Sequence, residues 1–368
     1  MTRRIPARPA AGAALLLALG QVSAAAAATG RPFSGAFRPV EAAHYALTPS
    51  SEEFYTEEYE LLAWNEAGDR IVVTFGVSNL GFGDGRAMVA VKVDRKGARS
   101  VRGETKFGSG DWSHRPDPFR MRLGPSVLSG GPGRLRAVVS VGEVALDLTF
   151  DNVLPPWRPG NGRALYDDSG DKYYDLTLLA PRARVTGTVT VRGRRTAFAG
   201  EGYADHRAMN VPPNVAGRRW VRFRAFDGDW TLILQELHFP KDLGGGRSPY
   251  LLVGYKDRVV FQSLGYRVKF GRVGRDRDPE TPYIYPHSMT VESTVGDRRF
   301  EVAIRGRKMR RRDLLAGLGH LERALLSKLV RPVGYYFDAD WDLSITAGGG
   351  QRWEASGPGS YYIKHITP

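Results

Sequence analysis

The chain has 368 residues, a formal net charge of +14 and no cysteine, so disulfides, thiolate metal ligands and a lipoprotein anchor are excluded. Aromatic residues make up 11% of the chain, which is typical of a folded protein and not of a disordered one. The basic residues are mostly arginine and are spread along the whole chain, so we expect no nucleic-acid partner.

The first 28 residues have the three parts of a secretory signal. Arg3, Arg4 and Arg8 give a cationic start, residues 11–19 form a short apolar run, and residues 23–28 offer cleavage sites between small side chains. The apolar run is too short to cross a bilayer, which argues against a retained anchor. We therefore expect residues 1–28 to be a signal peptide and the mature protein to be exported, either periplasmic or secreted.

After residue 54 the chain is a succession of short apolar or alternating runs bounded by Gly, Pro, Asp and Asn. Such runs, with a turn signal about every ten residues, are typical of a β-barrel or a β-sandwich. They do not alternate with long helical segments, so we do not expect a parallel α/β sheet. The predicted strands include residues 71–75, 88–93, 135–141, 144–150, 184–191, 195–203, 220–226, 230–237, 250–255, 259–264, 289–293 and 300–304.

Two stretches of the chain follow the same order of elements. Residues 59–93 and 220–255 each give an aromatic strand, a Gly-Asp turn, a second apolar strand, a glycine-rich loop and a third strand. This common order indicates two copies of one β unit, with a boundary near residues 173–184. We therefore predict an all-β protein with a first β-domain at residues 29–180 and a second at residues 181–368.

One stretch departs from the strand pattern. Leucine recurs there at helical spacing, at Leu314, Leu318, Leu321, Leu325 and Leu329. The spacing predicts a short amphipathic helix at about residues 310–330, ended by Pro332. Two interpretations stay open: the helix packs its apolar stripe on a barrel, or its arginine-rich start makes peripheral contact with a membrane.

A candidate catalytic cluster closes the strand before residue 207. The segment Gly200-Glu201-Gly202-Tyr203-Ala204-Asp205-His206 holds a phenol, a carboxylate and an imidazole. On an extended strand Tyr203 and Asp205 share one face and His206 points to the other, whereas a bulge would bring the three together. An aspartate can set the tautomer of a neighbouring histidine, and a buried carboxyl can give up a proton. A purely structural role is the alternative.

A longer pattern surrounds this cluster. An Arg/Val-rich strand and a Gly-x-Gly turn precede Gly-Tyr-x-Asp-His, then come a Pro-containing loop, a strand opening with Arg219-Trp220, and a strand closing in Glu-x-x-x-Pro at Glu236 to Pro240. Over residues 178–240 this resembles the lipocalin-like superfamily of carotenoid 1,2-hydratases (hydroxyneurosporene synthases), attachment-type proteins and Svf1-like survival factors. The resemblance implies two consecutive lipocalin-like antiparallel β-barrels, calycin-like in fold, with a cavity for an apolar molecule.

Two functions follow from this resemblance. The first is an exported protein that binds an apolar lipid or isoprenoid in a barrel cavity, with Trp220, Phe223 and Trp230 as candidate ligand-binding residues. The alternative is an enzyme, a hydratase, isomerase or cyclase acting on such a molecule. Its candidate catalytic residues are Tyr203, Asp205, His206 and Glu236. We expect neither a metal nor a cofactor, and the oligomeric state stays open.

The enzyme alternative is weakened where the sequence departs from the pattern. The hydratases have Asn-Trp-Gly after the histidine, whereas His206 is followed by Arg207-Ala208-Met209. Hydration of an alkene needs a well-placed acid and a group that stabilises the developing cation. Asp205 or Glu236 could be the acid, but Glu236 could equally form an ion pair with Arg222.

Overall fold

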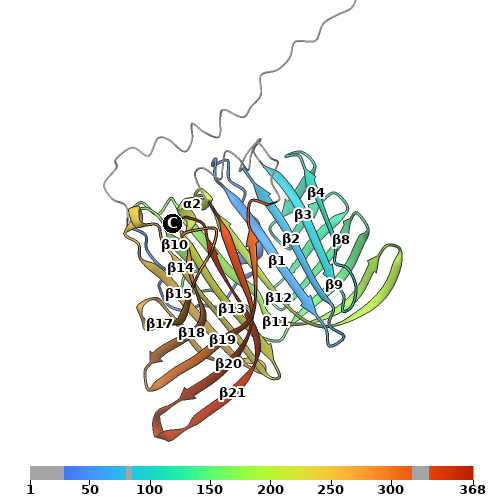
Figure 1. Cartoon of the computed structure of the whole chain (residues 1–368). Helices are drawn as coiled ribbons and strands as arrows, with labels where there is room; N and C mark the ends of the chain where they lie inside the picture. The colour runs from blue at the N-terminus through green and yellow to red at the C-terminus, as the bar shows by residue number, and fades with distance from the viewer. Residues whose placement is uncertain (1–28, 80–84, 317–330, 368) are drawn as a thin grey trace, which may run out of the picture.

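The computed structural model describes residues 29–79, 85–316 and 331–367, so the predicted signal peptide lies outside the described residues. The described chain is built of antiparallel strands in two curled sheets, as predicted (Figure 1). The all-β prediction is therefore confirmed. In Figure 1 the second sheet lies on the left and the first on the right, with the long strands β11 and β12 between them.

The first sheet has the strand order β4-β3-β2-β1-β12-β11-β9-β8-β7-β6-β5, with β10 paired to β11. Its strands are β1 (Thr56–Trp64), β2 (Arg70–Ser78), β3 (Arg86–Asp94), β4 (Val101–Phe107), β5 (Trp112–Arg115), β6 (Phe119–Leu123), β7 (Ser126–Gly131), β8 (Arg134–Val141), β9 (Val144–Asn152), β10 (Arg163–Leu165), β11 (Tyr173–Val191) and β12 (Arg194–Met209). The hairpin between β11 and β12 turns at Arg192-Gly193, where both residues have positive φ (51° and 77°). That geometry suits a two-residue turn between twisted strands.

The second sheet has the strand order β16-β15-β14-β13-β21-β20-β19-β18-β17. Its strands are β13 (Arg219–Asp227), β14 (Trp230–His238), β15 (Arg247–Tyr255), β16 (Arg258–Leu264), β17 (Val268–Arg277), β18 (Ile284–Val295), β19 (Arg298–Asp313), β20 (Val333–Thr346) and β21 (Arg352–His365). Every predicted strand lies within a strand of one of the two sheets.

The two sheets share one plan of connection. In each, four consecutive strands form a meander, and the first strand of that meander pairs with the last strand of the sheet: β1 with β12, and β13 with β21. The internal repeat read from residues 59–93 and 220–255 is therefore visible as β1–β3 and β13–β15. The predicted boundary at residue 180 falls inside β11, and the chain leaves the first sheet only after Met209.

Helices are few in the described residues. They are α2 (Pro213–Ala216) and the 3₁₀ turns η2 (Ala42–Tyr45), η3 (Lys241–Leu243), η4 (Gly265–Arg267) and η5 (Gly348–Gly350), and none of them is long or apolar enough to span a bilayer. The helix predicted at about residues 310–330 is wrong at its start, because residues 310–313 continue β19 and pair with β20. Residues 317–330 lie outside the described residues.

Three apolar cores follow from the alternation of buried and exposed side chains along the strands. In β3 every second residue is buried, which is the period of a strand with one face in a core. One core lies inside the first sheet and one inside the second, around residues such as Phe150 and Trp341. The third core joins residues from both sheets and from the segment around Phe33, so the sheets are packed against each other.

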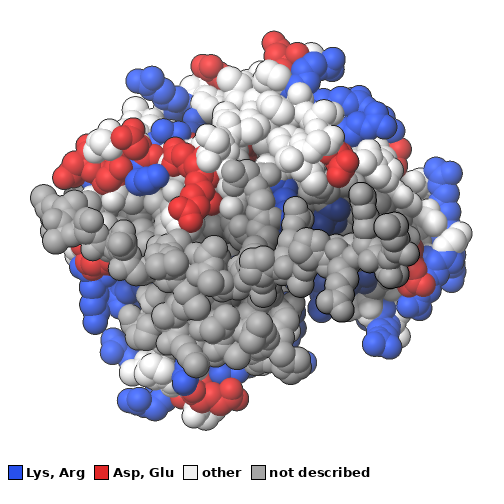
Figure 2. Space-filling model, turned by 90° about the horizontal axis from the view of Figure 1, so that it is seen from above, with Lys and Arg blue, Asp and Glu red and all other residues white. Residues whose placement is uncertain are grey.

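Basic side chains are distributed around the molecule. Seen from above, lysine and arginine side chains lie on several sides of the rim, interspersed with acidic ones (Figure 2).

Candidate functional site

The predicted catalytic cluster is divided between the two faces of β12. The β1–β12 register runs without a shift from Thr56↔Met209 to Trp64↔Glu201, so no bulge lies between Tyr203 and His206 on that side. Tyr203 and Asp205 accordingly point between the two sheets, and His206 points toward the first core. The extended alternative of the sequence analysis is therefore the one observed.

Asp205 is the centre of a buried network of charges between the sheets. The Tyr203 hydroxyl donates to Asp205 Oδ2 at 2.7 Å, and Arg222 Nη1 and Arg224 Nη2 lie 3.1 and 3.4 Å from the same oxygen. Arg207 Nε lies 3.2 Å from Oδ1. We call this group the inter-sheet cluster; it consists of Glu60, Tyr203, Asp205, Arg207, Arg222 and Arg224.

Glu60 supplies the second negative charge of the inter-sheet cluster. It accepts a hydrogen bond from Arg224 at 2.8 Å and lies 3.8 and 3.9 Å from Arg222 and Arg207. Burial alone would raise the pKa of Glu60, but the guanidinium groups of Arg224, Arg207 and Arg222 outweigh it and hold that pKa well below its ordinary value. The cluster thus has three guanidinium groups and two carboxylates, and a third carboxylate, that of Glu58, lies 3.3 Å from Arg207 at its edge.

Tyr203 is neutral in this setting. Burial, followed by the charge of Asp205, raises the pKa of Tyr203 well above its usual value. The Arg224 guanidinium lies 4.1 Å from the centre of the Tyr203 ring, a distance at which a cation is attracted to the ring face. Tyr203 therefore donates to Asp205 and holds Arg224 in place.

Unpartnered polar atoms lie beside the inter-sheet cluster. Arg222 Nε donates to Gln235 Oε1 at 2.9 Å, but Arg222 Nη2 and Gln235 Nε2 have no hydrogen-bond partner although both are buried. The hydroxyls of Tyr174 and Tyr250 are also buried and unpartnered. Both tyrosines interact electrostatically with Arg222 and Asp205, and burial raises the pKa of Tyr174 to about 12. These four groups all carry hydrogens that they can donate.

Apolar and aromatic side chains surround these donors. Tyr174 meets Trp220 edge to face, with ring centres 5.1 Å apart, and Tyr250 lies 5.4 Å from Trp157. Both tyrosines belong to the third core, together with leucines of β11 and β14. The inter-sheet region therefore combines an apolar wall with a small number of spare donors, which is the composition of a ligand site.

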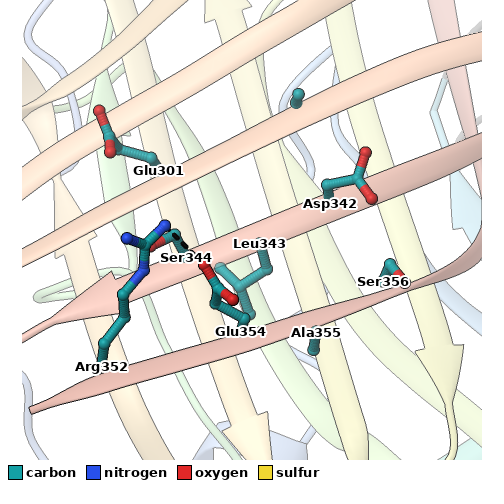
Figure 3. Close-up of a pocket in the computed structure, with 9 residues that line it drawn as sticks. Glu301, Asp342, Leu343, Ser344, Arg352, Glu354, Ala355 and Ser356 are labelled. Atoms are coloured by element: carbon teal, nitrogen blue, oxygen red, sulfur yellow. Dashed lines mark ion pairs between the residues drawn. The ribbon is translucent and has the colours of Figure 1, made fainter.

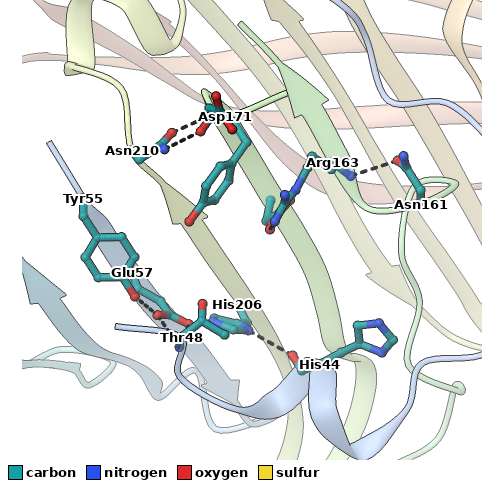
Figure 4. Close-up of polar contacts among 11 residues, drawn as sticks. His44, Thr48, Tyr55, Glu57, Asn161, Arg163, Asp171, His206 and Asn210 are labelled. Carbon is teal, nitrogen blue, oxygen red and sulfur yellow. Dashed lines mark hydrogen bonds and ion pairs between the residues drawn. The ribbon is translucent and has the colours of Figure 1, made fainter. Parts of the chain in front are cut away.

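His206 belongs to a separate cluster in which the polar groups are paired (Figure 4). Its Nε2 lies 2.5 Å from Glu57 Oε1, and its Nδ1 lies 3.1 Å from the carbonyl oxygen of His44. Glu57 also accepts from Tyr55 and from the Thr48 backbone N–H. We call Tyr55, Glu57, Tyr59 and His206 the Glu57–His206 cluster, since the His206 ring also stacks on Tyr59 at 4.2 Å.

Glu236 lies on the other face of the second sheet. It contacts His238 at 2.5 Å, Arg247 at 3.3 Å and Arg272, all on the side of the second core. The ion pair between Glu236 and Arg222 considered in the sequence analysis is therefore wrong, because adjacent strands place the two side chains on opposite faces of the sheet. Glu236 does not join Tyr203 and Asp205.

The three predicted ligand-binding residues are likewise separated. Trp220 is half-buried against the third core, next to the unpartnered donors. Phe223 is buried in the second core, and Trp230 packs against that core and lies 4.9 Å from Tyr255. The catalytic and ligand-binding roles of these residues stay predictions; the structure gives their places.

Sequence reasoning missed the residues that complete the inter-sheet cluster. Glu60 and Arg224 were not singled out, and Arg222 was considered only as a partner of Glu236. A signal was present, because Arg222 and Arg224 alternate with Val221, Phe223 and Ala225 on one strand. Charged residues at every second position would face solvent on an outer sheet, and only the packing of the second sheet against the first makes them buried.

A polar groove of about 560 Å³ lies on the solvent face of β19–β21 (Figure 3). It is lined by Glu301, Asp342, Ser344, Arg352, Glu354 and neighbouring residues. Arg352 pairs with Glu354 on the same strand, β21, while the side chain of Leu343 is buried in the second core. Among the described residues no group of three His, Asp or Glu side chains is placed to hold a metal ion.

Two consecutive curled antiparallel sheets give the chain the fold expected for the lipocalin-like two-domain proteins that it resembles. No family model matches the chain. The chain is 24% identical over 194 residues to the ceramide-binding protein svf1 of Schizosaccharomyces pombe. The aligned residues cover 50% of each chain. The chain thus spans about half the length of the curated relative it matches.

Solved structures share this fold. An AttH protein of Nitrosomonas europaea superimposes with a TM-score of 0.54 at 14% identity, covering 86% of this chain and 96% of that one. CghA, solved with Sch210972, gives a TM-score of 0.59 at 10% identity, covering 93% and 98%. Together with the similarity to svf1, these matches confirm the resemblance to the lipocalin-like superfamily that the sequence predicts.

Proposed function

We propose that the protein binds a lipid-class amphiphile between its two sheets, with the polar group of the ligand on the spare donors of the inter-sheet region. The observation that carries the proposal is a group of four buried, unpartnered atoms that can donate: Tyr174 Oη, Tyr250 Oη, Arg222 Nη2 and Gln235 Nε2. Asp205 Oδ1 is also buried without a hydrogen-bond partner and can accept from a ligand hydroxyl. Each buried polar group without a partner costs about 1–3 kcal/mol. A ligand that accepts hydrogen bonds from them would recover that free energy.

The chemistry of the four donors defines the ligand. All of them can donate, so the matching group is rich in acceptor oxygens, such as an amide carbonyl or a hydroxyl. The aromatic wall formed by Trp157 and Trp220 suits the apolar part of the same molecule. A ceramide has both parts, and the sequence similarity to a ceramide-binding protein supports this class of ligand.

The test removes one spare hydroxyl at a time. Tyr174→Phe and Tyr250→Phe each lose a donor that has no partner within the protein, so neither change should lower the melting temperature. Binding of a fluorescent ceramide, measured by titration, should weaken by about fivefold to tenfold in each variant, since one hydrogen bond is lost. Native mass spectrometry of the unmodified protein should show a co-purified lipid.

The matched control is Tyr59→Phe. The Tyr59 hydroxyl donates to the Tyr45 carbonyl at 2.8 Å inside the first core, away from the spare donors. This variant should lose stability and keep its affinity for ceramide. If Tyr174→Phe and Tyr250→Phe bind ceramide as the unmodified protein does, the donors serve only ordered water and the proposed site is wrong.

We also propose that the protein is exported. The cationic start, apolar run and small-residue cleavage sites of residues 1–28 support this. Cell fractionation after expression of the full chain should recover the protein outside the cytoplasm. Edman sequencing of the recovered protein should find its N-terminus near residue 29. Recovery of the uncleaved chain from the cytoplasm would contradict the proposal.

A further inference from the structure

Arginines gather at the end of the second sheet where β13 begins and β14 and β21 end. Arg219 lies on the same face of β13 as Val221 and Phe223, the face that covers the second core. We call this group the arginine mouth; it consists of Arg218, Arg219, Glu236, His238, Arg247, Arg272, Tyr283 and His365. Two of its four guanidinium groups, those of Arg247 and Arg272, pair with its one carboxylate, that of Glu236.

The carboxylate is already engaged. Glu236 is surrounded by His238, Arg247 and Arg272. In residues 29–79, 85–316 and 331–367, no carboxylate lies within ion-pair distance of Arg218 or Arg219. Arg219 Nη2 lies 2.9 Å from His238 Nε2, the same nitrogen that lies 2.5 Å from Glu236. When that nitrogen donates to Glu236, Nδ1 of the same ring, 3.4 Å from Arg219 Nη2, is the acceptor left for Arg219. The Nε atoms of Arg218 and Arg219 are buried and have no hydrogen-bond partner, so both residues keep a spare donor.

A cavity opens beside these charges. It has a volume of about 210 Å³ and is lined by Arg218, Arg219, Pro282, Tyr283, Ile284, His365 and Thr367. Two of its lining side chains are more than nine-tenths buried and have an unpartnered polar atom: His365 Nε2, with 8% of the residue exposed, and Tyr283 Oη, with 4%. The Tyr283 and His365 rings stack 4.5 Å apart, which fixes both.

We propose that this cavity binds a phosphate-class oxyanion. Guanidinium groups recognise phosphate oxygens through paired N–H donors, and His365 and Tyr283 add two more donors at the cavity wall. The volume suits a phosphate group with a few attached atoms and is smaller than a site for a whole lipid. Ile284, 43% exposed, and Pro282 form an apolar rim next to the charges.

Both histidines support this charge pattern. Burial, helped by Arg219, lowers the pKa of His365 to about 3, and burial lowers that of His238 to about 4. Both rings are therefore neutral at neutral pH, and the positive charge of the mouth belongs to the arginines. A neutral imidazole can still donate one hydrogen bond to an anion.

The arginine mouth is separate from the proposed lipid site. Arg219 and Trp220 are consecutive on β13, so their side chains lie on opposite faces of the second sheet. Substitutions at the mouth should therefore leave binding of neutral ceramide unchanged. Failure of one proposal is thus distinguishable from failure of the other.

The experiment uses the full chain and two probes. Inorganic phosphate is titrated by calorimetry, and phosphatidylcholine vesicles with and without phosphatidic acid are tested by co-sedimentation. Arg219→Gln and His365→Phe should each weaken binding about tenfold, since each loses a donor to the anion. His365→Phe keeps the stacked ring, so it reports on the site even if Arg219→Gln folds poorly.

Arg258→Gln is the matched control. Arg258 is 85% exposed on β16 of the same sheet, so this variant loses the same charge away from the mouth. If inorganic phosphate binds, and only the variants in the arginine mouth weaken that binding, the site is a general phosphate site. Binding of phosphatidic acid vesicles alone, with the same sensitivity, supports a lipid headgroup. The proposal is overturned if neither probe binds, or if His365→Phe and Arg258→Gln bind alike.

Discussion

Asp205 and His206 are neighbours on β12, yet they belong to two different kinds of polar cluster. The Glu57–His206 cluster points into the first core, and its carboxylate and both imidazole nitrogens have partners. The inter-sheet cluster meets buried atoms that have none, on Tyr174, Tyr250 and Arg222. A paired network fixes a structure, whereas spare buried donors indicate a place for something else to bind.

The largest expected effect comes from the centre of the inter-sheet cluster. Asp205→Asn removes a charge that faces Arg207, Arg222 and Arg224, and leaves these three buried guanidinium groups with Glu60 as their shared counter-charge within the cluster. The free energy of unfolding should fall by about 3–5 kcal/mol. Urea denaturation measures it. The exposed pair of Asp147 with Arg136 gives the control, since Asp147→Asn should cost less than about 1 kcal/mol.

His206→Phe tests the paired cluster. The phenyl ring keeps the stacking on Tyr59 but loses the hydrogen bonds to Glu57 and to the His44 carbonyl. Unfolding free energy should fall by about 2–3 kcal/mol because Glu57 stays buried without its main partner. Ceramide titration of the same variant should show unchanged affinity. A strong loss of affinity with little loss of stability would instead place His206 in the ligand site.

Glu60 makes the stability of the inter-sheet cluster depend on pH. The pKa of Glu60 is lower in the folded protein than its ordinary value of 4.5, so the unfolded chain binds more protons in acid. The stability that Glu60 contributes is present above that value and is lost as the pH falls through the folded pKa. Glu60→Gln should remove about 1–2 kcal/mol of acid sensitivity between neutral pH and about pH 3.5. Urea denaturation at both pH values measures this, and an unchanged acid sensitivity would contradict the ion-pair assignment.

The smallest expected effect on stability comes from removing single tyrosine hydroxyls, one paired and one unpaired. Tyr59→Phe removes a hydroxyl that donates to the Tyr45 carbonyl, and should cost about 1 kcal/mol. Tyr174→Phe removes a hydroxyl without a partner and should cost nothing or stabilise the protein slightly. Thermal denaturation of ligand-free protein separates the two. Equal losses would mean that the Tyr174 hydroxyl has a partner in solution.

The local pattern of the chain was enough to predict the strands and their repetition. Alternation of apolar and polar residues predicted the strands, because a strand with one buried face must repeat every two residues. The Gly-Asp turns and the order of elements predicted that β1–β3 and β13–β15 would be equivalent. The same period of two placed Tyr203 and Asp205 on one face and His206 on the other, once no bulge intervened.

Only the tertiary structure decided which of these faces meet. Arg222 and Arg224 follow an ordinary alternating pattern, and nothing local shows that their face packs against β1 and β12. The charge network with Glu60 and Asp205 exists because the two sheets enclose it. The strands that meet there, β1 and β13, are more than a hundred residues apart in the sequence. The sequence by itself determined the strands and the face of each side chain. The pairing of charges across the sheets was decided by packing, because such contacts depend on distance in space and not on spacing along the chain.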